Sequence, residues 1–311
     1  MGFEDKNLTF AGAGHISIAS PRNTLGKLLR TALTPLGFEV AIDGRGFGHN
    51  NQKLVSAGEA DLGAVNGDHA RWAYEGKFDF DGNARSNLRI IASICRPWWL
   101  GVAVKAETGL SDLRQIKERR FPARVRGAAS PYADRIWAYY GISGDDIEGW
   151  GGKFPRGSDF GGPVPTIRDP WARTGDFDVI VSSVYAAYTP ENRDFLEASI
   201  LWNLRFLSLP DDLTQQISKE VAGVPGLLPY QLLRGVDRDI PSVELPPQVV
   251  YTRDDVPDDL AYLIAKLLDE KRIMLRQTMM AFSYDPQVAA GDVGIPLHPG
   301  AERYYREVGY L

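Results

Sequence analysis

The chain has 311 residues, 44% of them hydrophobic, with 35 Lys and Arg against 40 Asp and Glu. A chain of this length exceeds what one hydrophobic core usually supports, so two domains are expected. The balanced charge and the lack of an apolar run near the roughly 18 residues of a membrane span favour a small-molecule partner, with no nucleic acid and no direct membrane insertion.

The N-terminal third alternates short apolar runs with helical patterns, as βαβ units of a largely parallel sheet do. Residues 8–11 predict a first strand, and leucines at helical spacing over 25–33 predict a helix after it. A second strand at 38–42, a helix at 52–57 and a third strand at 61–65 follow. This order of elements indicates an α/β fold.

Three polar loops follow these strands, at residues 12–17, 44–51 and 66–69. Open α/β sheets bind ligands at the carboxyl ends of their strands, where such loops converge. The loops are therefore expected to meet on one edge of the sheet and to form a binding site there.

A second passage repeats the pattern around the third strand. "GEADLGAVN" (58–66) and "GDFDVIVSS" (175–183) both contain a glycine, then an aspartate three residues later, then an apolar strand with a polar end. The repeat is short, but it indicates two α/β halves that each present a polar strand end.

The second half of the chain contains two stretches without apolar periodicity. Residues 149–170 predict a long loop or flap, and residues 227–247 predict extended surface chain. A helix is expected from Pro257 to about Met280, and a short one closes the chain over 299–309.

Two features bear on the compartment. The N-terminus "MGFEDKNLTFAG" lacks the basic and apolar regions of a signal peptide, so no export is expected from the chain as it stands. The single cysteine, Cys95, cannot form an internal disulfide and lies in the apolar run 90–95, where a buried, inert thiol is expected.

Three stretches carry a resemblance: "LVSAGEADLGAVNGDHARWAYEG" (54–76), "NLRIIASI" (87–94) and "GIPLHPGAERYYREVG" (294–309). Together they resemble the TAXI family of solute-binding subunits of TRAP transporters. The resemblance implies a two-lobed type II periplasmic binding-protein fold with a hinged interdomain cleft. It places the first lobe at 1–102 plus 250–311 and the second, inserted lobe at 103–249.

The same resemblance implies a function and a location. The ligand would be a small organic anion, either a carboxylate or an amino acid, bound without a cofactor and passed to membrane transporter subunits. The location would be periplasmic, with cytoplasmic as the alternative because of the N-terminus. The ligand-binding set expected from the resemblance and from the loops comprises His15, Ser17, Arg45, Gly46, His49, Asn50, Asn66, Asp68, His69, Arg96, Trp98, Trp99, Arg126, Ala129, Ser130, Ser182 and Ser183.

Three of the four histidines, His15, His49 and His69, fall on the three first-lobe loops. They are expected to bind the ligand or to hold the loops; their spacing matches no metal motif, and a divalent metal at this cluster is a further alternative. Asp68 either orients His69 or caps the helix that begins there. A cytoplasmic decarboxylase, lyase or sensor for an aromatic or other carboxylic acid is the competing function, with His15, His49, Asp68 and His69 as catalytic residues.

A carboxylate ligand needs a planar bidentate donor, and the arginines at strand ends are candidates. Arg96 and Arg126 are favoured over Arg45 because Arg96 lies near the expected hinge and Arg126 ends a strand. Trp98 and Trp99 either stack on a flat ligand or pack in the hinge.

Overall fold

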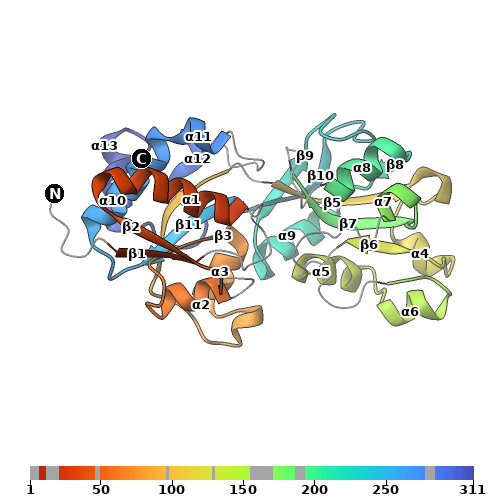
Figure 1. Ribbon diagram of the computed structural model, residues 1–311. Helices are drawn as coiled ribbons and strands as arrows, with labels where there is room; N and C mark the ends of the chain where they lie inside the picture. The colour runs from red at the N-terminus through yellow and green to blue at the C-terminus, as the bar shows by residue number, and fades with distance from the viewer. Residues whose placement is uncertain are drawn as a thin grey trace. The chain divides into compact units, whose positions relative to one another are not determined.

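The computed structural model describes residues 7–11, 21–45, 50–95, 98–127, 130–154, 171–185, 193–276 and 284–311. The chain divides into two compact units, which we call unit 1 (1–97 with 246–311) and unit 2 (98–245) (Figure 1). The chain crosses between them twice, at residues 97–98 and 245–246. Trp98 and Trp99 therefore belong to unit 2.

Unit 1 contains a five-stranded sheet in the order β2-β1-β3-β11-β4. Its strands are β1 (Asn7–Ala11), β2 (Glu39–Asp43), β3 (Leu62–Asn66), β4 (Leu88–Ser93) and β11 (Gln248–Arg253). Its helices are α1 (Pro21–Leu33), α2 (Asn50–Ser56), α3 (Gly67–Glu75), α10 (Asp258–Glu270), α11 (Arg272–Arg276), α12 (Pro286–Ala289) and α13 (Pro299–Glu307), with short 3-10 turns at Thr34–Leu36 and Phe78–Phe80. Strand β1 is parallel to β2 and β3, whereas β11, which follows the second crossing, is antiparallel to β3 and β4.

Unit 2 contains a six-stranded sheet in the order β6-β7-β5-β10-β9, with β8 paired to β5. Its strands are β5 (Trp98–Lys105), β6 (Val125–Gly127), β7 (Val179–Val184), β8 (Leu204–Phe206), β9 (Val224–Leu228) and β10 (Ile240–Leu245). Its helices are α4 (Arg114–Glu118), α5 (Pro131–Tyr139), α6 (Gly144–Gly149), α7 (Trp171–Thr174), α8 (Arg193–Leu201) and α9 (Asp211–Glu220), with a 3-10 turn at Ala106–Thr108.

The two sheets follow the same plan. Strands β6 and β7 are parallel, like β1 and β3, and β5 lies antiparallel beside β7 as β11 does beside β3. In each unit the strand beside this parallel pair comes directly after a crossing from the other unit. This is the two-sheet α/β arrangement of a type II periplasmic binding-protein fold, and the expected fold class is confirmed.

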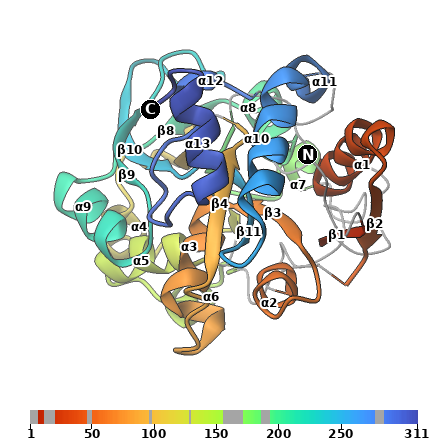
Figure 2. The ribbon, with the colours of Figure 1, turned by 90° about the vertical axis from the view of Figure 1, so that its left-hand side faces the viewer.

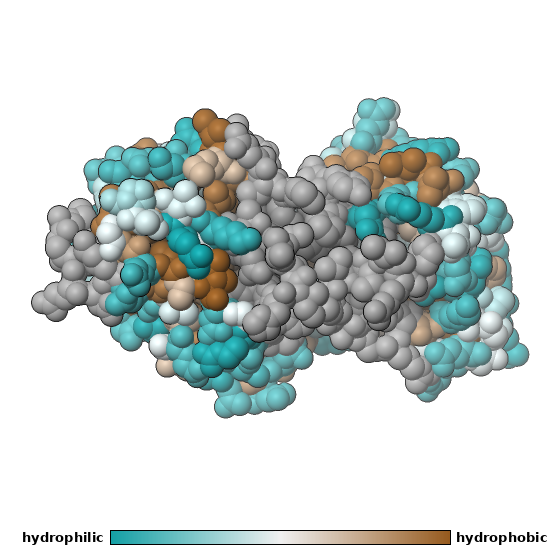
Figure 3. Space-filling view, in the orientation of Figure 1, coloured by the Kyte–Doolittle hydropathy of each residue, from teal (hydrophilic) through white to brown (hydrophobic). Residues whose placement is uncertain are grey.

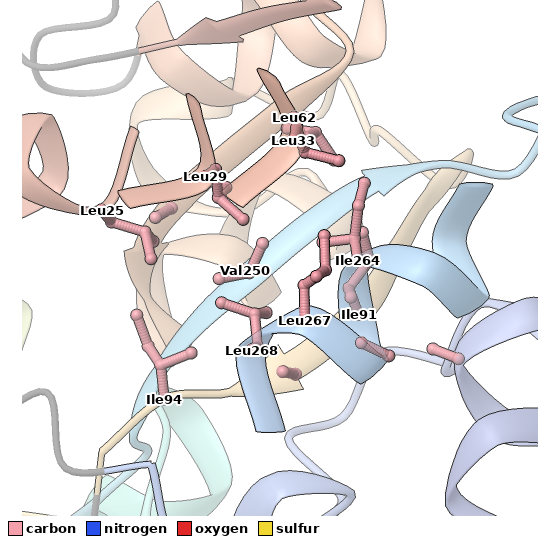
Figure 4. Packing of buried hydrophobic residues seen from close by; sticks show 14 of the residues in the cluster. Leu25, Leu29, Leu33, Leu62, Ile91, Ile94, Val250, Ile264, Leu267 and Leu268 are labelled. Carbon is pink, nitrogen blue, oxygen red and sulfur yellow. The ribbon is translucent and has the colours of Figure 1, made fainter. Parts of the chain in front are cut away.

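The core of unit 1 is built on the predicted leucine stripe of α1. Leu25, Leu29 and Leu33 recur every four residues and are buried against the sheet, next to side chains of β3, β11 and α10 (Figure 4). Each such leucine contributes on the order of 1.5–3 kcal/mol when it is fully buried. The stripe therefore fixes α1 on one face of the sheet.

Helices α10 and α13 pack against each other on unit 1, as Figure 2 shows. Asp269 joins them, because its Oδ2 atom accepts hydrogen bonds from the hydroxyls of Tyr304 (2.6 Å) and Tyr310 (3.0 Å). Its Oδ1 atom accepts one from Arg272 (2.6 Å). The continuous helix expected to Met280 is wrong: α10 ends at Glu270, Lys271 caps it, and α11 begins at Arg272. Residues 277–280 lie outside the described part of the chain.

The expectation of extended surface chain over 227–247 is also wrong. Residues 240–245 form β10, which is paired on both sides, to β5 and to β9. Ile240, Val243 and Leu245 are buried. Pro241 and Glu244 interrupt the apolar run and hid this inner strand from a periodicity argument. Of the other stretch expected to be a loop, 155–170 lies outside the described residues.

The repeated "GxxD" segments occupy equivalent places in the two units. In unit 1, Asp61 Oδ2 accepts the backbone N–H of Thr9 (2.7 Å), and the backbone N–H of Asp61 donates to the carbonyl of Thr9 (2.8 Å). In unit 2, Asp178 makes the same two contacts with Arg124, both at 2.8 Å. We call this pair of hydrogen bonds the aspartate clasp; it holds the start of β3 to β1 and the start of β7 to β6.

Unit 2 leaves a small apolar surface at the end of α8. Ile200 and Leu201 are 55% and 54% exposed, next to the ion pair between Arg173 and Glu197. Apolar side chains gather in this region of unit 2 in Figure 3. Two isolated residues of this kind are ordinary for a protein surface.

His298 is fully buried at the start of α13, where its Nδ1 atom accepts the backbone N–H of Gly300 (3.2 Å). Burial lowers the pKa of His298, although Asp258, with Oδ1 3.7 Å from Nδ1, acts in the opposite direction. The folded protein therefore keeps this imidazole neutral at a pH where the unfolded chain protonates it.

This shift predicts a loss of stability in mild acid. Above pH 6.5, His298 is neutral in both the folded and the unfolded protein. Below pH 6.5 it is protonated in the unfolded chain but stays neutral in the folded protein. The unfolding free energy therefore falls, by up to about 1.4 kcal/mol per pH unit. The variant H298N keeps a side chain that can cap α13 and should show a flatter dependence in urea titrations between pH 7.5 and 5. Identical slopes for both proteins would contradict the burial effect.

Candidate functional site

The stretch Asn66-Gly67-Asp68-His69 is not a surface turn. Strand β3 ends at Asn66, and α3 starts at the next residue. Gly67 donates its N–H to the carbonyl of Pro247 (2.9 Å), and a Cβ atom at Gly67 would lie 2.6 Å from that carbonyl oxygen. Only glycine allows this close approach, so the chain passes directly from strand to helix at the carboxyl end of the sheet.

The side chains of Asp68 and His69 are held within the first turns of α3. Asp68 is buried, and its Oδ1 atom accepts the backbone N–H of His69 (2.8 Å). The imidazole of His69 stacks on Trp72, with 4.7 Å between ring centroids. Asp68 thus accepts an N–H group in the first turn of α3, although this helix begins at Gly67 and not at His69 as expected, and the stacking gives His69 a fixed ring plane.

A buried polar network at the same end of the sheet was missed by the sequence analysis. Asn51, in the first turn of α2, donates from Nδ2 to the carbonyls of Ala11 (2.8 Å) and Ala64 (3.4 Å), and its Oδ1 accepts the hydroxyl of Tyr251. A Cβ atom at Gly63 would lie 2.4 Å from Asn51 Oδ1. The glycine inside an otherwise apolar strand was the available signal, because such a glycine often marks the close approach of another group.

Arg45 is not a free clamp. Its guanidinium contacts the carboxylates of Asp43 (2.6 Å) and Glu59 (3.0 Å), and its backbone carbonyl accepts Asn50 Nδ2 (3.1 Å). Hydrogen bonds from Arg45 lower the pKa of Asp43, the last residue of β2. Arg45 and Asn50 together close the turn after β2, and a ligand carboxylate would have to displace two acidic partners from Arg45.

In unit 2 the loop after β6 begins at Gly127, which has φ +117°. A Cβ atom there would lie 1.8 Å from the carbonyl oxygen of Val181, so no other residue fits without moving β7. The loop ends at Ser130, whose Oγ caps α5 by accepting the N–H of Ala133 (3.2 Å). Ser130 therefore holds the start of α5 at the carboxyl end of β6.

The carboxyl end of β7 brings together other predicted residues. Ser182 and Ser183 are half-buried, in register with Gly101 and Leu100 of β5. Trp98 is buried against Tyr185, with 4.4 Å between ring centroids, and Trp99 packs on the unit 2 core. The indole N–H of Trp98 is buried without a hydrogen-bond acceptor in the described part of the chain.

Arg126 has a different place from the one expected. Its Nη2 atom lies 2.6 Å from Asp176 Oδ2, and its Nε donates to the carbonyl of Asp176 (3.0 Å). Burial raises the pKa of Asp176, but Arg126, Lys153 and Arg124 outweigh it and lower the pKa overall. Asp176 precedes β7, so the guanidinium lies at the amino end of the parallel pair, away from the loop at Gly127 that it was expected to serve. This corrects the assignment of Arg126 as the ligand clamp.

The remaining predicted site residues, His15, Ser17, Gly46, His49, Arg96 and Ala129, lie outside the described residues. In the part of the chain that the structure does describe, no group of three or more His, Cys, Asp or Glu side chains is placed to hold a metal ion. The described helices are all too short or too polar to cross a membrane.

Cys95 is buried next to the crossing between the units, where its Sγ accepts the backbone N–H of Gln248 (3.1 Å). Burial raises the pKa of its thiol to about 12. The expectation of a buried thiol is confirmed, and a pKa this high agrees with the expected lack of reactivity.

Comparison with known proteins gives one family match: the NMT1-like family model matches residues 24–153 and 184–309. Similar solved structures include a glycine betaine and L-proline-binding protein from Borrelia burgdorferi (11% identity, 96% of this chain and 100% of that chain covered, TM-score 0.45). Lactococcal OpuAC complexed with glycine betaine is 12% identical (98% and 97% covered, TM-score 0.44). A protein from Prochlorococcus marinus in complex with methylphosphonate is also 12% identical (98% and 99% covered, TM-score 0.48). These values are too low to carry a ligand from one protein to another.

The position of Arg126 yields a prediction. Because its partner Asp176 is partly exposed, Arg126→Ala should lower the unfolding free energy in urea titrations by about 1 kcal/mol. Affinity for a bound carboxylate, measured by calorimetry, should change little.

The matched control is Asp176→Ala, which should have a similar effect, with the double variant losing less than the sum of the two. A large loss of affinity with unchanged stability would return Arg126 to the ligand site.

Proposed function

The chain belongs to the NMT1-like family, and on this premise we propose that it is a solute-binding protein for a small organic anion, either a carboxylate or an amino acid. The narrower identity, a TAXI-type subunit that passes the solute to a TRAP-type membrane transporter in the periplasm, is part of this proposal. It rests on the sequence stretches over 54–76, 87–94 and 294–309.

One observation carries the proposal: the two units repeat the same arrangement around their parallel strands. In each, an aspartate clasp fixes the start of the second strand of the pair. Each unit also has a glycine at a site of close approach where a strand ends, but the places differ: Gly67 follows the second strand of the pair in unit 1, and Gly127 ends the first strand of the pair in unit 2. The repeated arrangement gives each unit a polar strand end, and this supports the proposal.

The polar groups at these strand ends suit binding without chemistry. Ser130, Ser182 and Ser183 in unit 2 and Asn66 in unit 1 carry neutral hydrogen-bonding groups, and His69 adds an imidazole. Hydrogen bonds from such groups to a carboxylate are charge-assisted and hold it without a reaction.

The test is binding of named solutes. A solute that binds only the folded protein stabilises it by about 2.7 kcal/mol at a hundred times its Kd. We expect at least one of L-glutamate, L-leucine, glutarate and benzoate to raise the melting temperature by several degrees and to give saturable heat in calorimetry. Sodium chloride at equal ionic strength is the control.

The bound solute should be recovered unchanged when the complex is denatured and analysed by mass spectrometry. A chemically altered solute would identify an enzyme. If none of the four solutes shifts the melting temperature, the proposed ligand class is wrong.

A further inference from the structure

Two neighbouring amide side chains in α2 are both buried, but only one of them has hydrogen-bond partners among the described residues. Asn51 and Gln52 both have 0% of their surface exposed. The Asn51 amide uses its oxygen and its nitrogen in the hydrogen bonds to Tyr251, Ala11 and Ala64. In contrast, neither Oε1 nor Nε2 of Gln52 has a hydrogen-bond partner among the residues described.

An amide buried in this way opposes folding, because it gives up its hydrogen bonds to water and receives none in return. Most buried polar side-chain groups in proteins have a partner, so an unpartnered one calls for a specific explanation. Replacement of Gln52 by an apolar residue would remove this penalty. A partner that is not part of the chain, a bound solute or a trapped water, explains why an amide occupies the position.

The position of Gln52 favours the solute. The bond from Asn51 to Ala11, the last residue of β1, places the first turn of α2 at the carboxyl end of the β1–β3 pair. Asp68 lies at the same end, in the first turn of α3 directly after β3. Gln52 thus belongs to the edge of the sheet at which ligands bind in open α/β folds.

We infer that Gln52 completes its hydrogen bonds with the bound solute and selects one that offers a donor beside an acceptor, as the ammonium and carboxylate groups of an α-amino acid do. The carboxamide donates from Nε2 to a carboxylate oxygen and accepts an N–H at Oε1. This inference rests on the proposed function and narrows its ligand to the amino-acid class.

The test compares solutes that differ only in the amino group: L-glutamate against glutarate, and L-leucine against 4-methylpentanoate. The variant Q52M has nearly the same length as glutamine but cannot form hydrogen bonds of this kind. The wild-type protein should prefer the amino acid of at least one pair. In Q52M, calorimetry should show affinity for that amino acid about 10- to 100-fold lower, and little change for its amine-free analogue.

The neighbouring amide provides the matched control in the unliganded protein. N51L removes an amide with all its partners in place and should lower the melting temperature. Q52M should leave the melting temperature equal or higher, because the amide it removes has no partner to lose.

Each other outcome counts against the inference. If Q52M is destabilised like N51L and binds with unchanged affinity, the amide has a structural partner such as a trapped water. If Q52M weakens both members of a pair equally, or the wild-type protein does not discriminate between them, Gln52 does not select the amino group. If the wild-type protein binds none of the four solutes, the proposed function fails together with this inference.

Discussion

The aspartate clasp is the contact on which the candidate site depends. A parallel strand pair has no hairpin to set its register. Here an aspartate directly before β3 or β7 sets it: its carboxylate accepts a backbone N–H from the neighbouring chain segment, and its own backbone N–H donates to the carbonyl of the same residue. This register determines which residues of the two strands lie side by side toward their carboxyl ends. In unit 1 these include Ala11 and Ala64, the two residues whose carbonyls Asn51 joins.

Three glycines allow other groups to approach these strands closely: Gly63 near the start of β3, Gly67 directly after β3 and Gly127 at the end of β6. Gly63, Gly67 and Gly127 each lie where a side chain would collide with an amide oxygen or a backbone carbonyl. The space that they leave lets α2, the loop at 246–247 and β7 approach the strand ends closely. The described part of the candidate site therefore consists mainly of backbone and of short polar side chains.

Much of the fold was predictable because its signals are local. The leucine stripe of α1, the strand–loop–strand pattern up to β3 and the repeated "GxxD" segments all lie within short windows, and the structure contains each of them. β10 and the break after α10 were missed because tertiary contacts decide them. Pro241 and Glu244 are accommodated by pairing with β5 and β9, and the helical pattern is interrupted at Lys271, between α10 and α11. For the site, residue type showed which positions carry polar chemistry, but the partner of each side chain was not predictable. Arg126 is the example, because its acidic partner lies 50 residues away in sequence.

The central claim is that the loops at the carboxyl ends of the unit 1 strands bind the solute. The imidazole resonances of the four histidines test it most directly, since three of them lie on these loops in the sequence and His298 is buried at the start of α13. On saturation with a solute whose binding calorimetry has established, the signals of His69 and of at least one of His15 and His49 should shift, while that of His298 stays in place. Four unchanged signals in the presence of a bound solute would contradict the claim and place the site elsewhere on the molecule.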